Sequence, residues 1–180
     1  MDEVAEIASK EIQKRHPKLS KKEKEKRSEI IAQGAIKFFL LRTDSTRNII
    51  FNSEESLSFE GETGPYVQYT HARACSIMRK AKSKGKAKLD LLIHSKEHYL
   101  IKQLAEFPQK VKEAAEQYKP HLICHYLVNL SQSFNEFYHA FPVISDDKDL
   151  MNARLLLVDS VRQVLDNGLN LLGIVAPERM

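Results

Sequence analysis

The chain has 180 residues, 42% of them apolar and 29% charged, and its 28 Lys and Arg against 24 Asp and Glu give a net charge of +4. With six glycines, six prolines and no tryptophan, the composition argues against a large glycine-rich cofactor fold and against a low-complexity chain. The length predicts one domain, or one domain with an appendage. Two cysteines cannot form a disulfide framework, no apolar run is long enough for a membrane span, and no signal peptide is recognised. We therefore expect a cytoplasmic protein without membrane contact.

The N-terminal part predicts a charged helical lead-in followed by a buried helix. Residues 10–27 contain nine Lys or Arg and three Glu, so we expect a solvated helix, with a phosphate-binding arm as the alternative. In residues 30–41 apolar side chains recur every three or four positions, which predicts a buried helix, and Gly34 within it indicates close packing or a bend. Residues 47–52 predict a short strand or an extended link, and Ser53 is expected to cap a following helix.

Residues 58–64 contain two glycines and precede a proline, which predicts a compact loop. Thr63 is a suitable N-cap and Pro65 fits the first turn of a helix, so we expect a helix from here to about Ala81. Residues 79–88 then contain six Lys and Arg with no acid between them. Such a run predicts either phosphate contact or a solvated turn.

The rest of the chain is expected to be helical. Ser95 predicts a helix cap, and Pro108 and Pro120 each predict the first turn of a new helix. Residues 120–141 predict a long amphipathic helix, and residues 145–147, a serine followed by two aspartates, predict the start of the last one. Five or six antiparallel helices joined by short loops give an all-α fold, an antiparallel helix bundle.

The sequence predicts no catalytic, cofactor-binding or metal-binding residues. His94 and His98 are four residues apart and two more histidines flank Cys124, but no CxxC or HExxH motif accompanies them, so we expect structural or surface roles. Cys75 lies among apolar residues and is expected in the core. GxSxG, P-loop and GxGxxG motifs are absent, and paired acids fall where helices are expected to begin.

Aromatic residues close to the basic run suggest an RNA surface. Phe59, Tyr66 and Tyr69 lie in the predicted loop or at the start of the following helix. Rings on such segments can stack on unpaired bases. The alternative is that the tyrosines pack the loop onto the bundle, and the pattern alone leaves both interpretations open.

Four stretches resemble the C-terminal part of arginyl-tRNA synthetase, a class I aminoacyl-tRNA synthetase. Their order and spacing agree with that family: GAIKFF at 34–39, FEGETGPYVQY and HAR within 59–73, FNEFY at 134–138, and residues 153–180, which end in PERM. The family's anticodon domain is named for an Asp-Ala-Leu-Arg pattern, which reads Asp159-Ser160-Val161-Arg162 here. We expect its two charged ends to be a structural pair or surface residues.

The resemblance implies a DALR-type anticodon-binding helical bundle over residues 58–180, preceded by a helical leader, residues 1–57, similar to the end of the family's catalytic region. It implies two partners, the tRNA(Arg) anticodon stem-loop and the catalytic domain of a parent enzyme that ligates arginine to tRNA using ATP. The family's HIGH-like and KMSKS-like motifs are absent, so this chain is not expected to bind ATP or to aminoacylate alone. A helical protein–protein interaction module and a stand-alone tRNA-binding homologue are the alternatives.

The resemblance also implies roles for individual positions. Tyr69 corresponds to a ring that faces the anticodon loop, with Tyr66 nearby. Phe134, one turn before Tyr138, corresponds to an aromatic position facing anticodon bases, and Met180 to a position packed against an anticodon nucleotide. Rings and a polarizable thioether form a platform for unstacked bases. Three basic residues are expected to meet phosphates of the stem: Arg73, Arg79 and Lys80.

Overall fold

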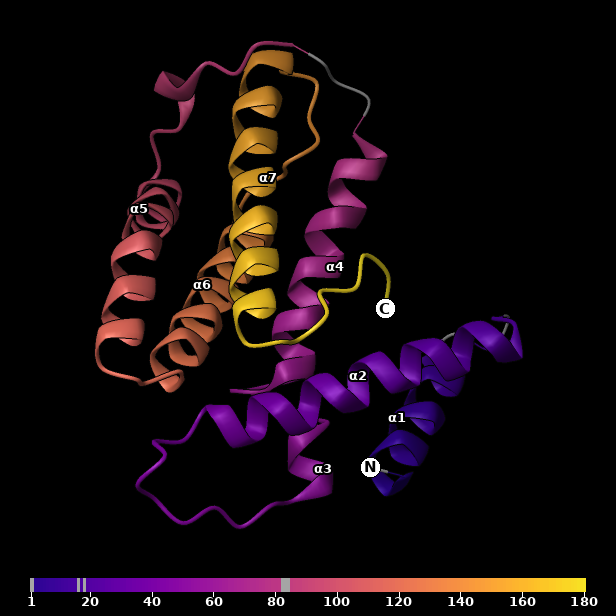
Figure 1. Ribbon diagram of the computed structural model, residues 1–180. Helices are drawn as coiled ribbons and strands as arrows, with labels where there is room; N and C mark the ends of the chain where they lie inside the picture. The colour runs from indigo at the N-terminus through magenta and orange to yellow at the C-terminus, as the bar shows by residue number, and fades with distance from the viewer. Residues whose placement is uncertain (1, 16, 18, 82–84) are drawn as a thin grey trace.

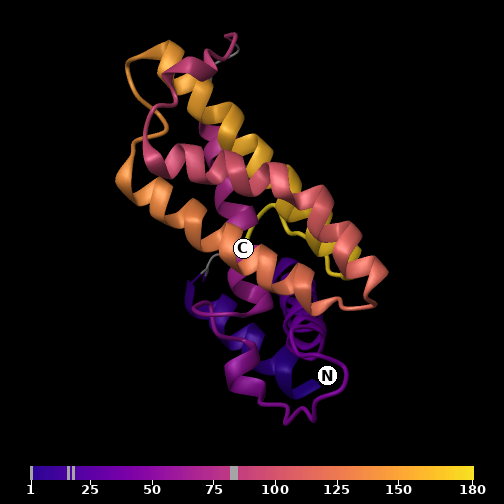
Figure 2. The same cartoon turned by 90° about the vertical axis from the view of Figure 1, so that its left-hand side faces the viewer.

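The computed structural model describes residues 2–15, 17, 19–81 and 85–180, and all regular secondary structure within these ranges is helical (Figure 1). This confirms the predicted all-α class. Helices α4 to α7 stand together as a bundle, and α1, α2 and α3 form a second group at one end of it (Figure 1 and Figure 2). None of the described helices is both long and apolar enough to cross a membrane. The elements are α1 (Asp2–Arg15), α2 (Lys21–Leu41), α3 (Ser53–Ser56), α4 (Gly64–Lys80), the short 3-10 helix η1 (Leu89–Leu91), α5 (Ser95–Glu116), α6 (His121–Ala140) and α7 (Lys148–Leu171).

The charged lead-in folds onto α2. Val4, Ala8 and Ile12 follow one another at intervals of four residues, so they share one face of α1, and each is at most 5% exposed. They pack with α2 and with Leu57 in a hydrophobic cluster separate from that of the bundle. Most of the described side chains in residues 10–27 are exposed, as expected for a solvated segment, whereas Ile12 is buried because it continues the apolar face of α1.

Helix α2 connects this leader to the bundle. It begins at Lys21, where the Ser20 hydroxyl accepts a hydrogen bond from the Glu23 backbone N–H at 3.3 Å. The second part of the charged run, residues 21–27, and the apolar segment thus belong to one helix, while residues 10–15 belong to α1. Towards its end Ala35 packs in the leader's cluster while Phe38 is buried in the cluster of the bundle, so α2 belongs to both hydrophobic cores.

Helices α2 and α4 cross at two glycines. A Cβ atom at Gly64 would lie 2.6 Å from the carbonyl oxygen of Gly34 and 2.8 Å from the Cβ of Phe38. A Cβ atom at Gly34 would lie 2.6 Å from the side-chain amide of Gln68. The two backbones are therefore so close that neither position has room for a side chain. The close packing predicted from Gly34 is confirmed.

The loop before α4 ends in the predicted cap. The Thr63 hydroxyl accepts a hydrogen bond from the Tyr66 N–H at 3.2 Å, and Pro65 occupies the first turn. Arg42, just past the end of α2, donates to the Glu62 carbonyl at 2.8 Å. The loop is therefore fixed at both the α4 side and the α2 side of the crossing.

Several local predictions change in the structure. Residues 47–52 form no strand and correspond to the extended-link alternative. The cap of α3 is Asn52, whose Oδ1 accepts a backbone N–H at 3.0 Å, and Ser53 is the first helical residue. Pro108 lies inside α5 and starts no new helix. The preceding Phe107 packs against the core of the bundle, and such tertiary contacts hold a helix together across the hydrogen bond that a proline removes.

A buried ion pair fixes the start of α5 against α7. Glu97 Oε1 accepts from Arg154 Nε at 2.8 Å, and the two side chains are 0% and 5% exposed. The other Glu97 oxygen accepts from the His94 N–H at 3.0 Å, and Arg154 also donates to the Pro142 carbonyl at 2.9 Å. Both charges thus have the additional hydrogen bonds that burial demands. The residue that caps α5 is His94 and not the predicted Ser95.

Replacing Gly64 by alanine is expected to destabilise the fold by about 1–3 kcal/mol, because the added methyl group meets the backbone of α2 and forces two packed helices apart. Gly168→Ala in α7 is the comparison, since its methyl group meets side-chain atoms of Leu127 and no backbone of another helix. Urea unfolding of both variants and of the unchanged chain measures the free energies. Equal losses in the two variants would contradict this account of the crossing.

Candidate nucleic-acid interface

Residues 173–180 form a tail that returns along α4. Gly173 has a φ of 67°, which glycine adopts without steric cost, and it turns the chain at the end of α7. Lys37 of α2 donates to the Gly173 carbonyl at 2.5 Å. Figure 1 shows the tail ending beside α4 and close to α2. Three side chains of α4 donate hydrogen bonds to carbonyls of the tail: Gln68 to Val175 at 2.8 Å, His71 to Pro177 at 3.0 Å and Arg79 to Glu178 at 3.1 Å.

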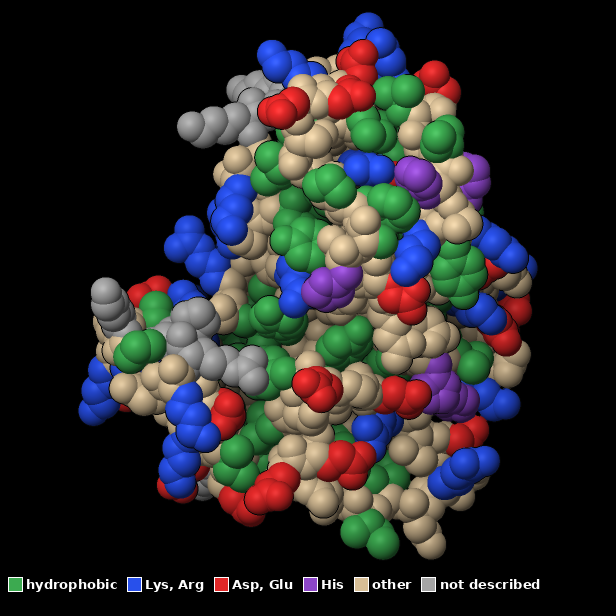
Figure 3. Space-filling view, turned by 180° about the vertical axis from the view of Figure 1, so that it is seen from behind, with side chains coloured by type: hydrophobic (Ala, Val, Ile, Leu, Met, Phe, Trp, Pro, Cys, Tyr) green, Lys and Arg blue, Asp and Glu red, His purple; other side chains and the backbone are tan. Residues whose placement is uncertain are grey.

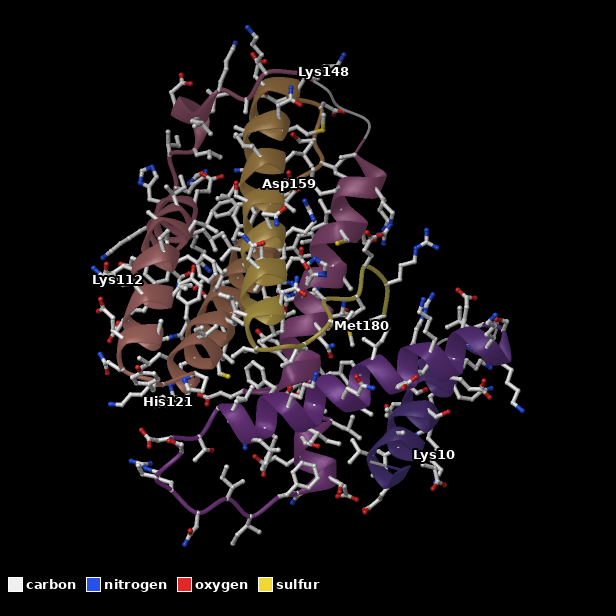
Figure 4. All side chains as sticks on the ribbon, in the orientation of Figure 1. Lys10, Lys112, His121, Lys148, Asp159 and Met180 are labelled. Atoms are coloured by element: carbon white, nitrogen blue, oxygen red, sulfur yellow. The ribbon has the colours of Figure 1, made fainter. Side chains whose placement is uncertain are left out.

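A hollow of about 500 Å³ opens where the tail meets α4, and we call it the tail hollow. Its wall combines an aromatic ring, a thioether and four guanidinium groups. Met180 lies at the end of the tail, between α4 and α2 (Figure 4). Four of the predicted tRNA-binding residues are thus brought together here: Tyr69, Arg73, Arg79 and Met180. The complete lining is Arg27, Tyr69, Ala72, Arg73, Ser76, Arg79, Arg179 and Met180.

A second hollow of about 380 Å³, which we call the α4–α6 groove, adjoins the tail hollow. Arg73 and Ser76 line both, so Arg73 stands on the ridge between them. The predicted residue Lys80 lines the groove and is absent from the wall of the tail hollow. The groove is lined by Arg73, Ser76, Ile77, Lys80, Tyr138, His139 and residues 141–144.

The guanidinium group of Arg73 is held by a network of polar and aromatic groups. Its carbon atom lies 4.8 Å from the centre of the Tyr69 ring and 5.6 Å from that of Tyr138. It donates to Asn135 Oδ1 at 2.5 Å and to the Tyr69 hydroxyl at 3.1 Å. Asn135 in turn donates to the Tyr66 hydroxyl at 3.0 Å. Tyr66 therefore supports the site through this network and lines a neighbouring hollow instead of the tail hollow.

Both interpretations of the loop aromatics have a basis in the structure. The edge of the Tyr69 ring meets Phe59, with ring centres 6.3 Å apart, so Tyr69 does pack the loop onto the bundle. The same ring also lines the tail hollow and carries Arg73 over one face. Tyr69 is half-buried, which leaves part of the ring accessible.

Phe134 does not face the site. Its ring is fully buried in the bundle, so it cannot touch an RNA base without displacing the core. The exposed ring on this part of α6 is Tyr138, which is 38% exposed and stacks on Phe134 at a centroid distance of 6.4 Å. The helical period of α6 is the sequence signal for this burial. Phe134 continues the apolar stripe through Leu127 and Leu130, whereas Asn135 lies off it.

The positive charge of the site comes from α4 and the tail. Arg79, Lys80 and Arg179 are exposed, and within the described part of the chain no acidic group lies within ion-pair distance of them. Of the predicted basic run, Lys82 and Lys84 lie outside the described residues. Lys88, the last member of this run, pairs with Asp149 of α7 at 2.5 Å and lines neither hollow. On the face seen in Figure 3, basic and acidic side chains are intermixed, so no field of one sign extends over it.

Neither cysteine is placed for chemistry. Burial raises the pKa of the Cys75 thiol, and it raises the pKa of Cys124 to about 12, so both remain protonated. Among the described residues, no group of three or more His, Cys, Asp or Glu is arranged to hold a metal ion. His121 lies near Asp44, with Nδ1 and Oδ2 3.9 Å apart, and His94 stacks on Phe141 with ring centres 4.5 Å apart.

The sequence matches one known domain family over much of its length. Residues 67–180 match the DALR anticodon binding domain. The chain belongs to this family. The start of the match lies inside α4, so the predicted boundary between residues 57 and 58 stays a prediction.

Relatives of this DALR domain are much longer proteins. All of the chain aligns at 41% identity with the arginine–tRNA ligase of Thermococcus sibiricus and at 43% with that of Pyrococcus abyssi, and it covers 29% and 30% of those proteins. The structure of Thermus thermophilus arginyl-tRNA synthetase superposes on 99% of the chain with a TM-score of 0.91 and 40% identity, using 32% of that protein. The chain thus spans about a third of the length of these relatives.

The two charged ends of the pattern that names the DALR family pair with each other here. Arg162 Nε donates to Asp159 Oδ1 at 2.7 Å within α7, and this hydrogen bond raises the pKa of the arginine. Neither residue lines the tail hollow or the α4–α6 groove. The expectation of a structural pair is confirmed.

Acidification is expected to destabilise the DALR domain through His71. Burial holds the pKa of this imidazole below its usual value of about 6.5, although the hydrogen bond to the Pro177 carbonyl opposes the shift. The unfolded chain therefore binds the proton more readily than the folded one. The stability contributed by neutral His71 is complete above about pH 6.5 and is lost as the pH falls through the lower folded-state pKa.

Urea unfolding at about pH 7.5 and about pH 5.5 measures this loss. We expect His71→Gln to have a smaller pH dependence than the unchanged chain, because an amide can still donate to Pro177 but does not titrate. His98→Gln, at an exposed position of α5, is the control and should keep the original dependence. The same pH dependence in His71→Gln and the unchanged chain would exclude this role.

Proposed function

We propose that this chain is the part of an arginine–tRNA ligase that binds the anticodon arm of tRNA(Arg), using the tail hollow and the α4–α6 groove. The observation that carries the proposal is the convergence of Tyr69, Met180 and four arginines on one hollow in a DALR anticodon-binding domain. The likeness to arginine–tRNA ligases over the whole chain supports arginine as the amino acid concerned.

The chemistry of the tail hollow suits an opened RNA loop. Unpaired anticodon bases expose their faces, which stack on aromatic rings and on guanidinium planes. Tyr69 provides such a surface, and the thioether of Met180 adds a polarizable contact. Arg73, whose guanidinium group lies between two tyrosine rings, offers its charge to phosphates of the loop. Arg79 and Lys80, exposed at the end of α4, are suited to phosphates of the stem.

The remainder of the enzyme is proposed to supply the reaction. The relatives are about three times as long as this chain, and the HIGH-like and KMSKS-like motifs are absent from it, so arginine activation with ATP is assigned to a catalytic domain elsewhere. An exposed apolar group at the α2 end of the molecule suits contact with that domain: Leu40, Ile49, Ile50 and Phe51. We place this enzyme in the cytoplasm, as predicted from the sequence.

Binding of a fluorescent tRNA(Arg) anticodon stem-loop tests this function. We expect tighter binding than to a stem-loop of equal length with changed anticodon bases, and weaker binding at about 200 mM than at about 50 mM salt, because phosphate contacts release counterions. Equal binding of the two RNAs would contradict anticodon recognition. Absent or salt-insensitive binding would favour the helical interaction module instead.

In the same assay Tyr69→Ala is expected to weaken stem-loop binding by about 1–3 kcal/mol, the range for loss of one stacked base. Tyr99→Ala is the matched control, since this tyrosine is 55% exposed on α5 and lines neither hollow. Circular dichroism checks that both variants stay folded. An affinity of Tyr69→Ala equal to that of Tyr99→Ala would remove Tyr69 from the interface.

A further inference from the structure

Asn135 of α6 connects to a single stripe on α4. Its side chain makes hydrogen bonds with Tyr66, Thr70 and Arg73. These three residues follow one another at intervals of four and three positions, so they share one face of α4. The amide nitrogen donates to the Tyr66 hydroxyl at 3.0 Å and to the Thr70 hydroxyl at 3.4 Å. The amide oxygen accepts from Arg73 Nη1 at 2.5 Å. The amide nitrogen therefore faces the two hydroxyl groups, and this orientation directs the amide oxygen at Arg73.

Arg73 is in this way fixed without being neutralised. Within the described residues, no carboxylate lies at ion-pair distance from Arg73. The acid next in sequence to Asn135, Glu136, pairs with Lys96 at 3.5 Å instead. A neutral amide and a tyrosine hydroxyl hold the guanidinium group, so its full positive charge remains available on the ridge between the two hollows.

We infer that Asn135 is a positioning residue for RNA, which holds Arg73 between the rings of Tyr69 and Tyr138 while leaving its charge free for the anticodon loop. The inference rests on the proposed function. A flexible arginine loses rotamer freedom when it binds, and a guanidinium group that is already fixed loses less. A neutral partner provides this ordering, whereas a carboxylate would provide it and also cancel the attraction to phosphate.

Two substitutions of Asn135 separate the ordering of Arg73 from the availability of its charge. Asn135→Ala removes the partner of Arg73 and is expected to weaken stem-loop binding roughly tenfold. Asn135→Asp keeps an acceptor at the same distance but adds a negative charge, and we expect it also to weaken binding and to reduce the salt dependence by about one phosphate contact. Gln132→Ala is the control, because Gln132 lies one turn away on α6, is exposed and lines the hollow beside Asn135. It should leave affinity unchanged.

A double-mutant cycle with Arg73→Ala shows whether Asn135 acts through Arg73. Once Arg73 is removed, Asn135→Ala should cause no further loss of affinity. A purely structural role would give the same loss in both backgrounds and would lower the thermal midpoint of Asn135→Ala. Unchanged affinity in Asn135→Ala, or a full loss in the Arg73→Ala background, would overturn the inference.

NMR of the Arg73 Nε–Hε group without RNA distinguishes failure of this inference from failure of the proposed function. We expect restricted motion of this group in the unchanged chain and in Asn135→Asp, and greater motion in Asn135→Ala. If the motion changes in this way but Arg73→Ala binds the stem-loop normally, the proposed RNA site is wrong and the inference falls with it. If Arg73→Ala weakens binding but the motion is the same in all three, only the positioning role is overturned.

Discussion

The close crossing of α2 and α4 is the constraint on which the rest of this structure depends. Because Gly34 and Gly64 bring the two backbones together, Gln68 is buried at the crossing and donates to Val175 of the tail. The tail then follows α4 and places Met180 against the leader's cluster. The tail hollow is thus built from three segments that are distant in sequence, and the crossing brings together the two helices whose side chains hold the tail.

The sequence predicted features that depend on local signals. The all-α class, the Thr63 cap and the close contact at Gly34 follow from periodicity, capping chemistry and the missing Cβ atom, and the structure confirms them. The resemblance named Tyr69 and Met180, which the structure brings into one hollow, but their RNA contacts stay predictions. The sequence did not predict features that depend on tertiary contacts, because a sequence pattern does not show which residues pack against each face of a helix.

Three cases show this limit in physical terms. Phe134 belongs to the FNEFY stretch that resembles the arginyl-tRNA synthetase family. The rotation of α6 about its axis nevertheless buries the ring of Phe134 and exposes that of Tyr138. Pro108 is a common helix start, but packing in the bundle carries α5 through it. The role of Asn135 depends on Arg73, 62 residues earlier in the chain, and no local spacing connects the two.

Methyl NMR of the methionines, with and without the tRNA(Arg) anticodon stem-loop, tests most directly whether the tail hollow holds the RNA. Met180 lines the hollow, whereas Met78 and Met151 pack against the core of the bundle and serve as internal references. We expect the Met180 signal to shift on saturation with RNA while those of Met78 and Met151 stay in place. RNA binding that leaves Met180 unshifted would contradict the assignment of the tail hollow as the anticodon site.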